Sequence, residues 1–199
     1  MLSEAAGAVH RPAGAGSHAI GGCDAAVPRY SRRMALPESD DIPAPLALFR
    51  EAVRPEWIDY NGHMNVAFYV LAFDHATDAF FDWLGIGESY LRRNNCSTFT
   101  LEAHVTYERE VHAGAPLAFT TRLIDFDAKR IRYIHLMHHA EEGFLAATNE
   151  LMSLHVDMTR RRSAPLPEAV QALLARVKEA HDRLPPTPQA GRRISLDRH

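Results

Sequence analysis

The stretch Asp59-Tyr60-Asn61-Gly62-His63-Met64-Asn65 decides the fold expected for this chain. It places a carboxylate, two amides, a glycine and an imidazole directly ahead of an apolar segment, residues 66–84, that we expect to be a helix. The first turn of a helix offers unpaired backbone N–H groups and the positive end of a dipole. A carboxylate beside such donors can attack a carbonyl group or activate water against it. Polar turn residues also start helices without any catalytic role, so the spacing alone leaves both interpretations open.

Apolar residues cover more than one stripe of this helix, so we expect other parts of the protein to cover it on several sides. Its most polar face carries Asp74, Asp78 and Asp82, which recur every four residues. We expect these acids to face solvent or a loop. Gly85 and Gly87 end the helix.

Runs with strand-like alternation surround the helix. The expected strands are residues 46–53, 98–109, 117–126, 131–139 and 144–156. In residues 98–109 one face is apolar, and the other carries Glu102 and His104. The apolar face consists of Phe99, Leu101, Ala103, Val105 and Tyr107. Because short turns join antiparallel neighbours, we predict an α+β fold with a five-stranded antiparallel sheet wrapped round a long central helix, followed by a C-terminal helix.

Composition divides the chain into one domain with extensions. We expect a disordered extension over 1–43, the sheet-and-helix domain over 44–158, a helical segment over 159–184 and a flexible tail over 185–199. The first segment lacks the apolar core of a secretory signal. The sequence contains no run of about 18 apolar residues, so we predict no transmembrane helix. We therefore expect a cytoplasmic protein.

Charge and motif content exclude several classes of partner. The formal net charge of -3 gives no reason to expect a nucleic acid or an anionic membrane. The chain lacks the P-loop and the dinucleotide G-x-G-x-x-G motif. Neither its two cysteines nor the cluster His135, His138 and His139 has the spacing or partners of a metal site, so we expect no metal.

The order of strand, D-x-N-G-H-x-N loop, helix and four strands resembles the hot-dog-fold acyl-CoA thioesterases of the 4-hydroxybenzoyl-CoA thioesterase-like family. The resemblance covers about residues 45–157. More narrowly, residues 55–66, 101–107 and 154–158 resemble the betainyl-CoA thioesterases of carnitine breakdown. This resemblance implies a homodimer or homotetramer that hydrolyses a short polar or cationic acyl-CoA, such as betainyl-CoA. Coenzyme A enters only as part of the substrate and product, with no other cofactor.

The resemblance also implies roles for the residues of the motif. Asp59 matches the catalytic carboxylate, as nucleophile or general base, and the backbone N–H of Val66 polarises the thioester carbonyl. Gly62 allows a tight turn and close approach of the acyl group. His63 and Asn65 position the loop, the water or the thioester, and Asn65 has helix capping as an equal alternative. Asn61 completes the predicted site.

Further residues are candidates for binding the substrate. Aromatic faces hold a trimethylammonium group well, although each aromatic candidate is equally a core residue. The candidate walls are Trp57, Tyr60, Tyr69 and Phe99. Glu102 and His104 either reach the motif loop of a partner subunit or form a solvated or dimer-facing sheet surface. Coenzyme A phosphates have basic candidates in Lys129, Arg130 and Arg132, or in residues 160–162.

Two other functions remain to be distinguished. Hydratases of this shape carry an Asp and a His about five residues apart, whereas Asp59 and His63 are four apart. A non-catalytic acyl-CoA-binding module predicts that Asp59 is dispensable for ligand affinity and that no thiol is released.

Overall fold

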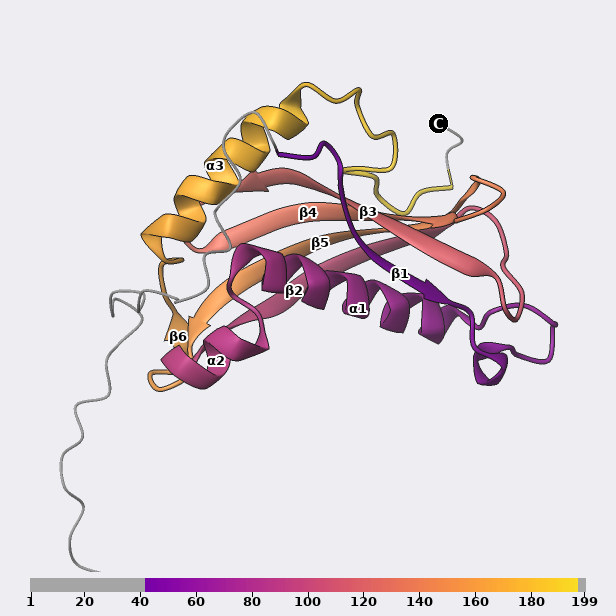
Figure 1. Ribbon diagram of the computed structural model, residues 1–199, viewed down its shortest axis with the longest axis horizontal. Coiled ribbons are helices and arrows are strands. Elements are labelled where there is room, and N and C mark those ends of the chain that lie inside the picture. The colour runs from indigo at the N-terminus through magenta and orange to yellow at the C-terminus, as the bar shows by residue number, and fades with distance from the viewer. Residues whose placement is uncertain (1–41, 197–199) are drawn as a thin grey trace, which may run out of the picture.

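A five-stranded antiparallel sheet curls along a long helix in the computed structural model, which describes residues 42–196 (Figure 1). Two-residue β6 (Arg162–Ser163) extends the sheet by pairing with β5. The five long strands, in spatial order, are β1 (Leu46–Ala52), β3 (Pro116–Phe126), β4 (Arg130–His139), β5 (Leu145–Asp157) and β2 (Cys96–Tyr107). This architecture confirms the predicted α+β fold. The predicted N-terminal extension lies almost entirely outside the described residues.

The long helix α1 (Val66–Leu84) begins and ends at the signals in the sequence. Asn65 is its N-cap, because the side-chain oxygen accepts a hydrogen bond from the Ala67 N–H at 3.0 Å. Gly85 ends the helix in the left-handed conformation, with φ of 79°, and donates its N–H to the Asp82 carbonyl. The N-cap residue Asn65 is thus also the last residue of the Asp59 motif.

Two shorter elements and a C-terminal helix complete the fold. A 3-10 turn, η2 (Pro55–Trp57), precedes the motif, and α2 (Glu88–Asn94) follows α1 without having been predicted. The predicted C-terminal helix is α3 (Glu168–Asp182), which packs against β3. There His181 accepts a hydrogen bond from the Leu123 N–H through its Nδ1 atom at 2.9 Å. No helix within residues 42–196 is long and apolar enough to cross a membrane.

The segment after α3, predicted as a flexible tail, runs back across the sheet. Arg122 on β3 donates hydrogen bonds to the Leu184 carbonyl and to the Thr187 hydroxyl. Farther along, the Gly191 N–H donates to a carboxylate oxygen of Glu150 on β5 at 2.6 Å. These bonds fix residues 184–191 over the face of the sheet that carries Glu150.

A hydrophobic cluster between α1 and the sheet anchors the motif loop. Trp57, just before the loop, and Met64, inside it, are both almost completely buried. Full burial of such a side chain stabilises the fold by about 1.5–3 kcal/mol. Their neighbours in this cluster include Tyr69, Phe73, Val111 and Phe119. The base of the loop is thus anchored by buried side chains, although its tip faces solvent.

The predicted alternation of β2 is wrong at one point. Thr100 pairs with Ser153 and Glu102 pairs with Met152, so β2 carries one extra residue between the two pairs. A bulge of this kind moves all side chains on one side of it to the opposite face. Phe99 therefore shares a face with Glu102 and not with Ala103. The sequence-based prediction missed this because an alternating pattern does not show where a bulge occurs.

One side of α1 lacks the cover that its apolar composition predicts. Within this chain Val66 is 59% exposed, and Val70 and Leu71 are exposed as well. Farther along the same side lie Asp74, Asp78 and Asp82, all exposed as expected. The N-terminal half of α1 consequently presents an apolar surface next to the motif loop.

Candidate active site

A tight loop places the Asp59 side chain beside the start of α1. The Asp59 N–H donates to the His63 carbonyl at 3.1 Å, and the Gly62 N–H donates to the Asp59 carbonyl at 3.0 Å. Gly62 has φ of 84°, a conformation that other residues rarely adopt. A Cβ atom added to Gly62 would meet no atom within 4 Å, so the loop surface above it is open. The turn therefore gives a ligand access to the peptide next to Asp59.

Two hydrogen bonds orient the Asp59 carboxylate. Its Oδ1 atom accepts from the Asn61 backbone N–H at 2.8 Å. Its Oδ2 atom accepts from the Asn65 side-chain amide at 3.4 Å, which is long for such a bond. Both donors belong to the predicted site. The carboxylate is thus directed by its own loop on one oxygen and by the helix cap on the other.

The first turn of α1 leaves the backbone N–H of Val66 available. Ala67 donates to the Asn65 side chain, and Phe68 donates to the Asn65 carbonyl at 3.0 Å. The N–H of Val66 has no acceptor among residues 42–196. It lies at the positive end of the helix dipole, where it can stabilise a developing oxyanion. The family resemblance implies that this N–H polarises the thioester carbonyl.

His63 turns toward a residue that was not predicted for the site. Its Nε2 atom lies 3.9 Å from a carboxylate oxygen of Glu110. The same carboxylate lies 3.9 Å from Nε2 of His112, whose Nδ1 atom is 3.0 Å from the Gly62 carbonyl. The sequence offers no local sign of these contacts, because about fifty residues separate the two segments. Folding brings them together through the chain that leaves β2.

The four aromatic candidates differ in access. Trp57 is 2% exposed and stacks on Phe68 with ring centroids 5.6 Å apart, so its ring belongs to the core. Tyr69 is also buried, and burial raises the pKa of its hydroxyl. Tyr60 is 97% exposed beside Asp59, whereas Phe99 is 42% exposed on β2. Among the four, Tyr60 is the one that presents an open ring at the motif loop.

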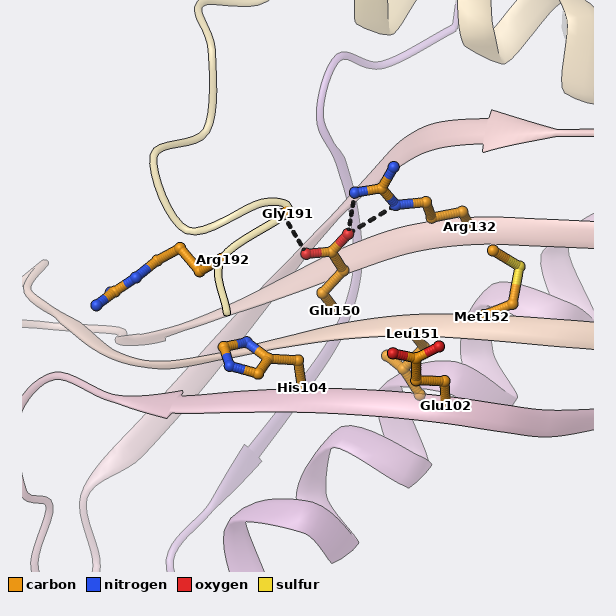
Figure 2. A pocket seen from close by; sticks show the side chains of 8 residues that line it. All are labelled: Glu102, His104, Arg132, Glu150, Leu151, Met152, Gly191 and Arg192. Atoms are coloured by element: carbon orange, nitrogen blue, oxygen red, sulfur yellow. Dashed lines mark hydrogen bonds and ion pairs between the residues drawn. The ribbon is translucent and has the colours of Figure 1, made fainter. Parts of the chain in front are cut away.

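Glu102 and His104 line a separate pocket of about 330 Å³ (Figure 2). Glu150 forms the centre of this pocket, where Arg132 pairs with it at 2.6 Å and the Gly191 N–H bonds to it. The remaining lining comes from Leu151, Met152 and Arg192. Glu150 alternates with Leu151, which packs in the core, so the pocket lies on the face turned away from α1. Within one chain the structure does not bring Glu102 or His104 to the Asp59 loop.

The basic candidates for coenzyme A lie at the other end of the sheet. Lys129 directly precedes β4 and accepts a hydrogen bond from the His155 N–H near the end of β5. The start of β4 lies far along the sheet from the N-terminal end of α1 (Figure 1). Arg130 pairs with Asp127 and holds the pKa of that carboxyl at about 2. Arg132 is engaged by Glu150. Within one chain these side chains do not meet Asp59.

His135, the buried member of the histidine cluster, has a structural role. His135 lies between the hydroxyl groups of Thr77 and Thr121, at 3.0 and 2.9 Å. Complete burial lowers the pKa of His135 to about 3, so the ring is neutral. Over residues 42–196, no three His, Cys, Asp or Glu side chains gather as metal ligands would.

Comparisons with known proteins identify the family. The sequence model of the thioesterase-like superfamily matches residues 53–174. A betainyl-CoA thioesterase of Pseudomonas aeruginosa is 38% identical over 151 residues, which is 76% of this chain and 95% of that protein. A putative thioesterase of Pseudomonas putida KT2440 is similar in structure, with 36% identity and a TM-score of 0.68 over 79% of this chain and 99% of that one.

A second solved structure, protein SAV2348 of Staphylococcus aureus in complex with CoA, is 27% identical with a TM-score of 0.72. It is matched over 79% of this chain and 99% of its own. The family model covers more than half of the chain, and the curled sheet along α1 has the topology expected for that family. The chain therefore belongs to the thioesterase-like superfamily and has its hot-dog fold.

Proposed function

We propose that this protein hydrolyses acyl-CoA thioesters at the junction of the Asp59 loop and α1. The observation that carries the proposal is the pairing of an oriented carboxylate with an available backbone donor. Asp59 is held by Asn61 and Asn65, and the Val66 N–H lacks an acceptor within residues 42–196. Acyl transfer needs both a nucleophile or base and a donor for the oxyanion.

The chemistry follows from these two groups. The thioester carbonyl oxygen accepts a hydrogen bond from the Val66 N–H, which makes the carbonyl carbon more electrophilic. In one route an Asp59 oxygen attacks that carbon, the C–S bond breaks and coenzyme A leaves as the thiolate, which takes up a proton. Water then hydrolyses the acyl-aspartyl anhydride and regenerates the carboxylate. In the other route Asp59 takes a proton from the water that attacks the thioester carbon. The C–S bond then breaks, and the departing thiolate takes that proton, which restores the Asp59 carboxylate.

Betainyl-CoA is the substrate that we propose. The similarity to the betainyl-CoA thioesterase of P. aeruginosa supports this choice, because it covers nearly all of that protein. The trimethylammonium group of a betainyl thioester is attracted to aromatic faces. Tyr60 offers such a face next to Asp59, and its 97% exposure means that none of residues 42–196 covers the ring.

We also propose that the working form is a homodimer joined along β2. This strand lies at one edge of the sheet, and its residues Phe99 to Ala103 are all exposed. A long exposed edge with apolar side chains is a template for pairing with another strand. Leu101, 57% exposed, and Val66 and Val70 on α1 supply apolar area for the contact.

Such a dimer accounts for the distant basic residues. Two β2 strands that pair in antiparallel fashion place the Cys96 end of one beside the Tyr107 end of the other. The start of β4 lies near the Cys96 end, because Lys129 bonds to His155 and His155 is near the partner of Cys96 in β5. The partner subunit's Lys129 then approaches the Asp59 end of this chain. There it can meet the phosphates of coenzyme A.

Thiol release from a panel of acyl-CoAs tests the proposed function. The panel contains betainyl-, acetyl-, butyryl- and 4-hydroxybenzoyl-CoA, with Asp59→Asn as the blank. Fastest release from betainyl-CoA supports the full proposal. Faster release from an aliphatic or aromatic member keeps the hydrolase and rejects betaine as the preferred acyl group. No release from any member, together with retained binding of coenzyme A, favours the alternative of a non-catalytic acyl-CoA-binding module.

A further inference from the structure

The chain that leaves β2 forms a fixed base under the Asp59 loop. The Met64 N–H donates to the Val111 carbonyl at 2.9 Å, and Val111 is almost completely buried. Beyond it, the Gly114 N–H donates to the Val53 carbonyl at 2.8 Å, and the Val53 N–H donates to the Ala115 carbonyl at 3.0 Å. Residues 110–115 are therefore tied both to the loop and to the end of β1.

His112 provides the contact between this base and the tip of the loop. Its Nδ1 atom lies 3.0 Å from the Gly62 carbonyl oxygen. A carbonyl oxygen can only accept, so Nδ1 must carry the proton and donate it. Within residues 42–196, no other side chain from outside the loop forms a hydrogen bond to residues 60–62. The conformation of the tip thus depends on His112 together with bonds inside the loop itself.

Glu110 adds orientation and little binding energy. Its carboxylate lies 3.9 Å from Nε2 of both His63 and His112. The side chains of Glu110 and His112 are 60% and 66% exposed, and exposed ion pairs contribute little to stability. The hydrogen bond to Gly62 is accordingly the contact through which His112 holds the tip of the loop.

The bond to Gly62 is connected to the Asp59 carboxylate by a short path. Gly62 is held at φ of 84°, and the residue before it, Asn61, donates its N–H to Asp59 Oδ1 at 2.8 Å. The Gly62 carbonyl and the Asn61 N–H belong to different peptide groups, and a shift of the backbone of residues 61–62 after loss of the His112 bond would move the Asn61 N–H away from that oxygen. In acyl transfer a displacement of about 1 Å can cost about a hundredfold in rate.

We propose that His112 is a positioning residue, which holds the Gly62 carbonyl so that Asn61 keeps the Asp59 carboxylate aimed at the thioester. This inference rests on the proposed function. It assigns to His112 no contact with the substrate and no transfer of protons. In this role the side chain has only to supply one N–H donor, at the position of Nδ1, to the Gly62 carbonyl.

Substitutions that remove or replace this donor test the inference. In His112→Ala, kcat for thiol release is expected to fall about 10–100-fold while KM changes less than about threefold. The Asn61 amide is expected to exchange its hydrogen about tenfold faster, measured by NMR. His112→Asn can place its side-chain N–H near Nδ1 and is expected to restore both quantities to within about threefold. Glu141→Gln, an exposed turn substitution, is the control. If His112→Ala does not fold, His112→Leu takes its place.

The outcomes separate the inference from the function on which it rests. Unchanged kcat and unchanged Asn61 exchange in His112→Ala overturn the inference. An equal loss of kcat in His112→Ala and His112→Asn also overturns it, because an imidazole is then required for itself. Full turnover in Asp59→Asn overturns the proposed function, whereas faster Asn61 exchange in His112→Ala still supports the role of His112 in holding the loop.

Discussion

The side-chain amide of Asn65 links the start of α1 to the Asp59 carboxylate. Its oxygen caps the helix through the Ala67 N–H at 3.0 Å, and its nitrogen lies 3.4 Å from Asp59 Oδ2. Capping and catalysis were alternatives for this residue when only the sequence was considered. In the structure one side chain makes both contacts, since an amide carries an acceptor and donors on the same group.

Substitutions of Asn65 should separate its two contacts. Asn65→Ala removes the cap and is expected to lower the free energy of unfolding by about 1 kcal/mol. Asn65→Ser keeps an acceptor for the Ala67 N–H but cannot donate to Asp59 in the same way. We expect Asn65→Ser to recover most of the stability, measured by urea denaturation, without recovering thiol release. Recovery of both by serine would show that the contact with Asp59 has no role.

The Val66 N–H can be removed without disturbing the helix. Proline is favoured at the first position of a helix, and Asn65 already has the extended conformation that precedes proline, with ψ of 144°. Val66→Pro is therefore expected to fold with a nearly unchanged melting temperature. Without the donor, kcat should fall about 10²–10³-fold. Val66→Ala retains the N–H and serves as the control, and equal activity of the two variants would rule out this oxyanion donor.

Tyr60 should influence the choice of acyl group more than the fold. A cation–π contact at an exposed site contributes about 0.5–1 kcal/mol, which corresponds to about a two- to fivefold change in KM. Tyr60→Leu is expected to raise KM for betainyl-CoA by this factor and to leave KM for butyryl-CoA unchanged. Tyr60→Phe keeps the aromatic face and should resemble the native protein. A parallel change for both substrates in Tyr60→Leu would contradict the cation-binding role.

Burial of His135 predicts a loss of stability in acid. Burial lowers its pKa from 6.5 to about 3, so the unfolded chain binds a proton over this range and the folded chain does not. The free energy of unfolding should thus fall as the pH decreases from 6.5 toward 3, by at most about 1.4 kcal/mol per pH unit for this group. Denaturation curves of His135→Gln should show a slope smaller by one proton. An identical slope would mean that His135 is protonated in the folded protein.

The sequence was sufficient for most of the fold because local signals agree with the tertiary structure. Asn65 and Gly85 mark the ends of α1, and the strand alternation identifies all five long strands. The bulge between Thr100 and Glu102 could not be predicted, since an extra residue leaves no mark in an alternating pattern. Phe99 was placed on the wrong face for that reason.

The candidate site was predictable only where it is local in sequence. Asp59, Asn61, Asn65 and Val66 lie within one loop and one helix turn, so a single motif predicted their meeting. Contacts such as that of His112 with Gly62 join segments about fifty residues apart and depend on the path of the chain after β2. The surroundings of Glu102 and His104 depend on which face of β2 the two residues occupy. They also depend on Gly191, which comes after α3 in the chain and lines the same pocket.

The most direct measurement of the central claim compares thiol release from betainyl-CoA by the native protein and by Asp59→Asn. The substitution preserves the size of the side chain and an acceptor for Asn61, but it removes the charge needed for attack or proton transfer. We predict a loss of about 10²–10⁴-fold in kcat, with unchanged melting temperature and unchanged affinity for coenzyme A. Turnover by Asp59→Asn at the native rate would contradict the account.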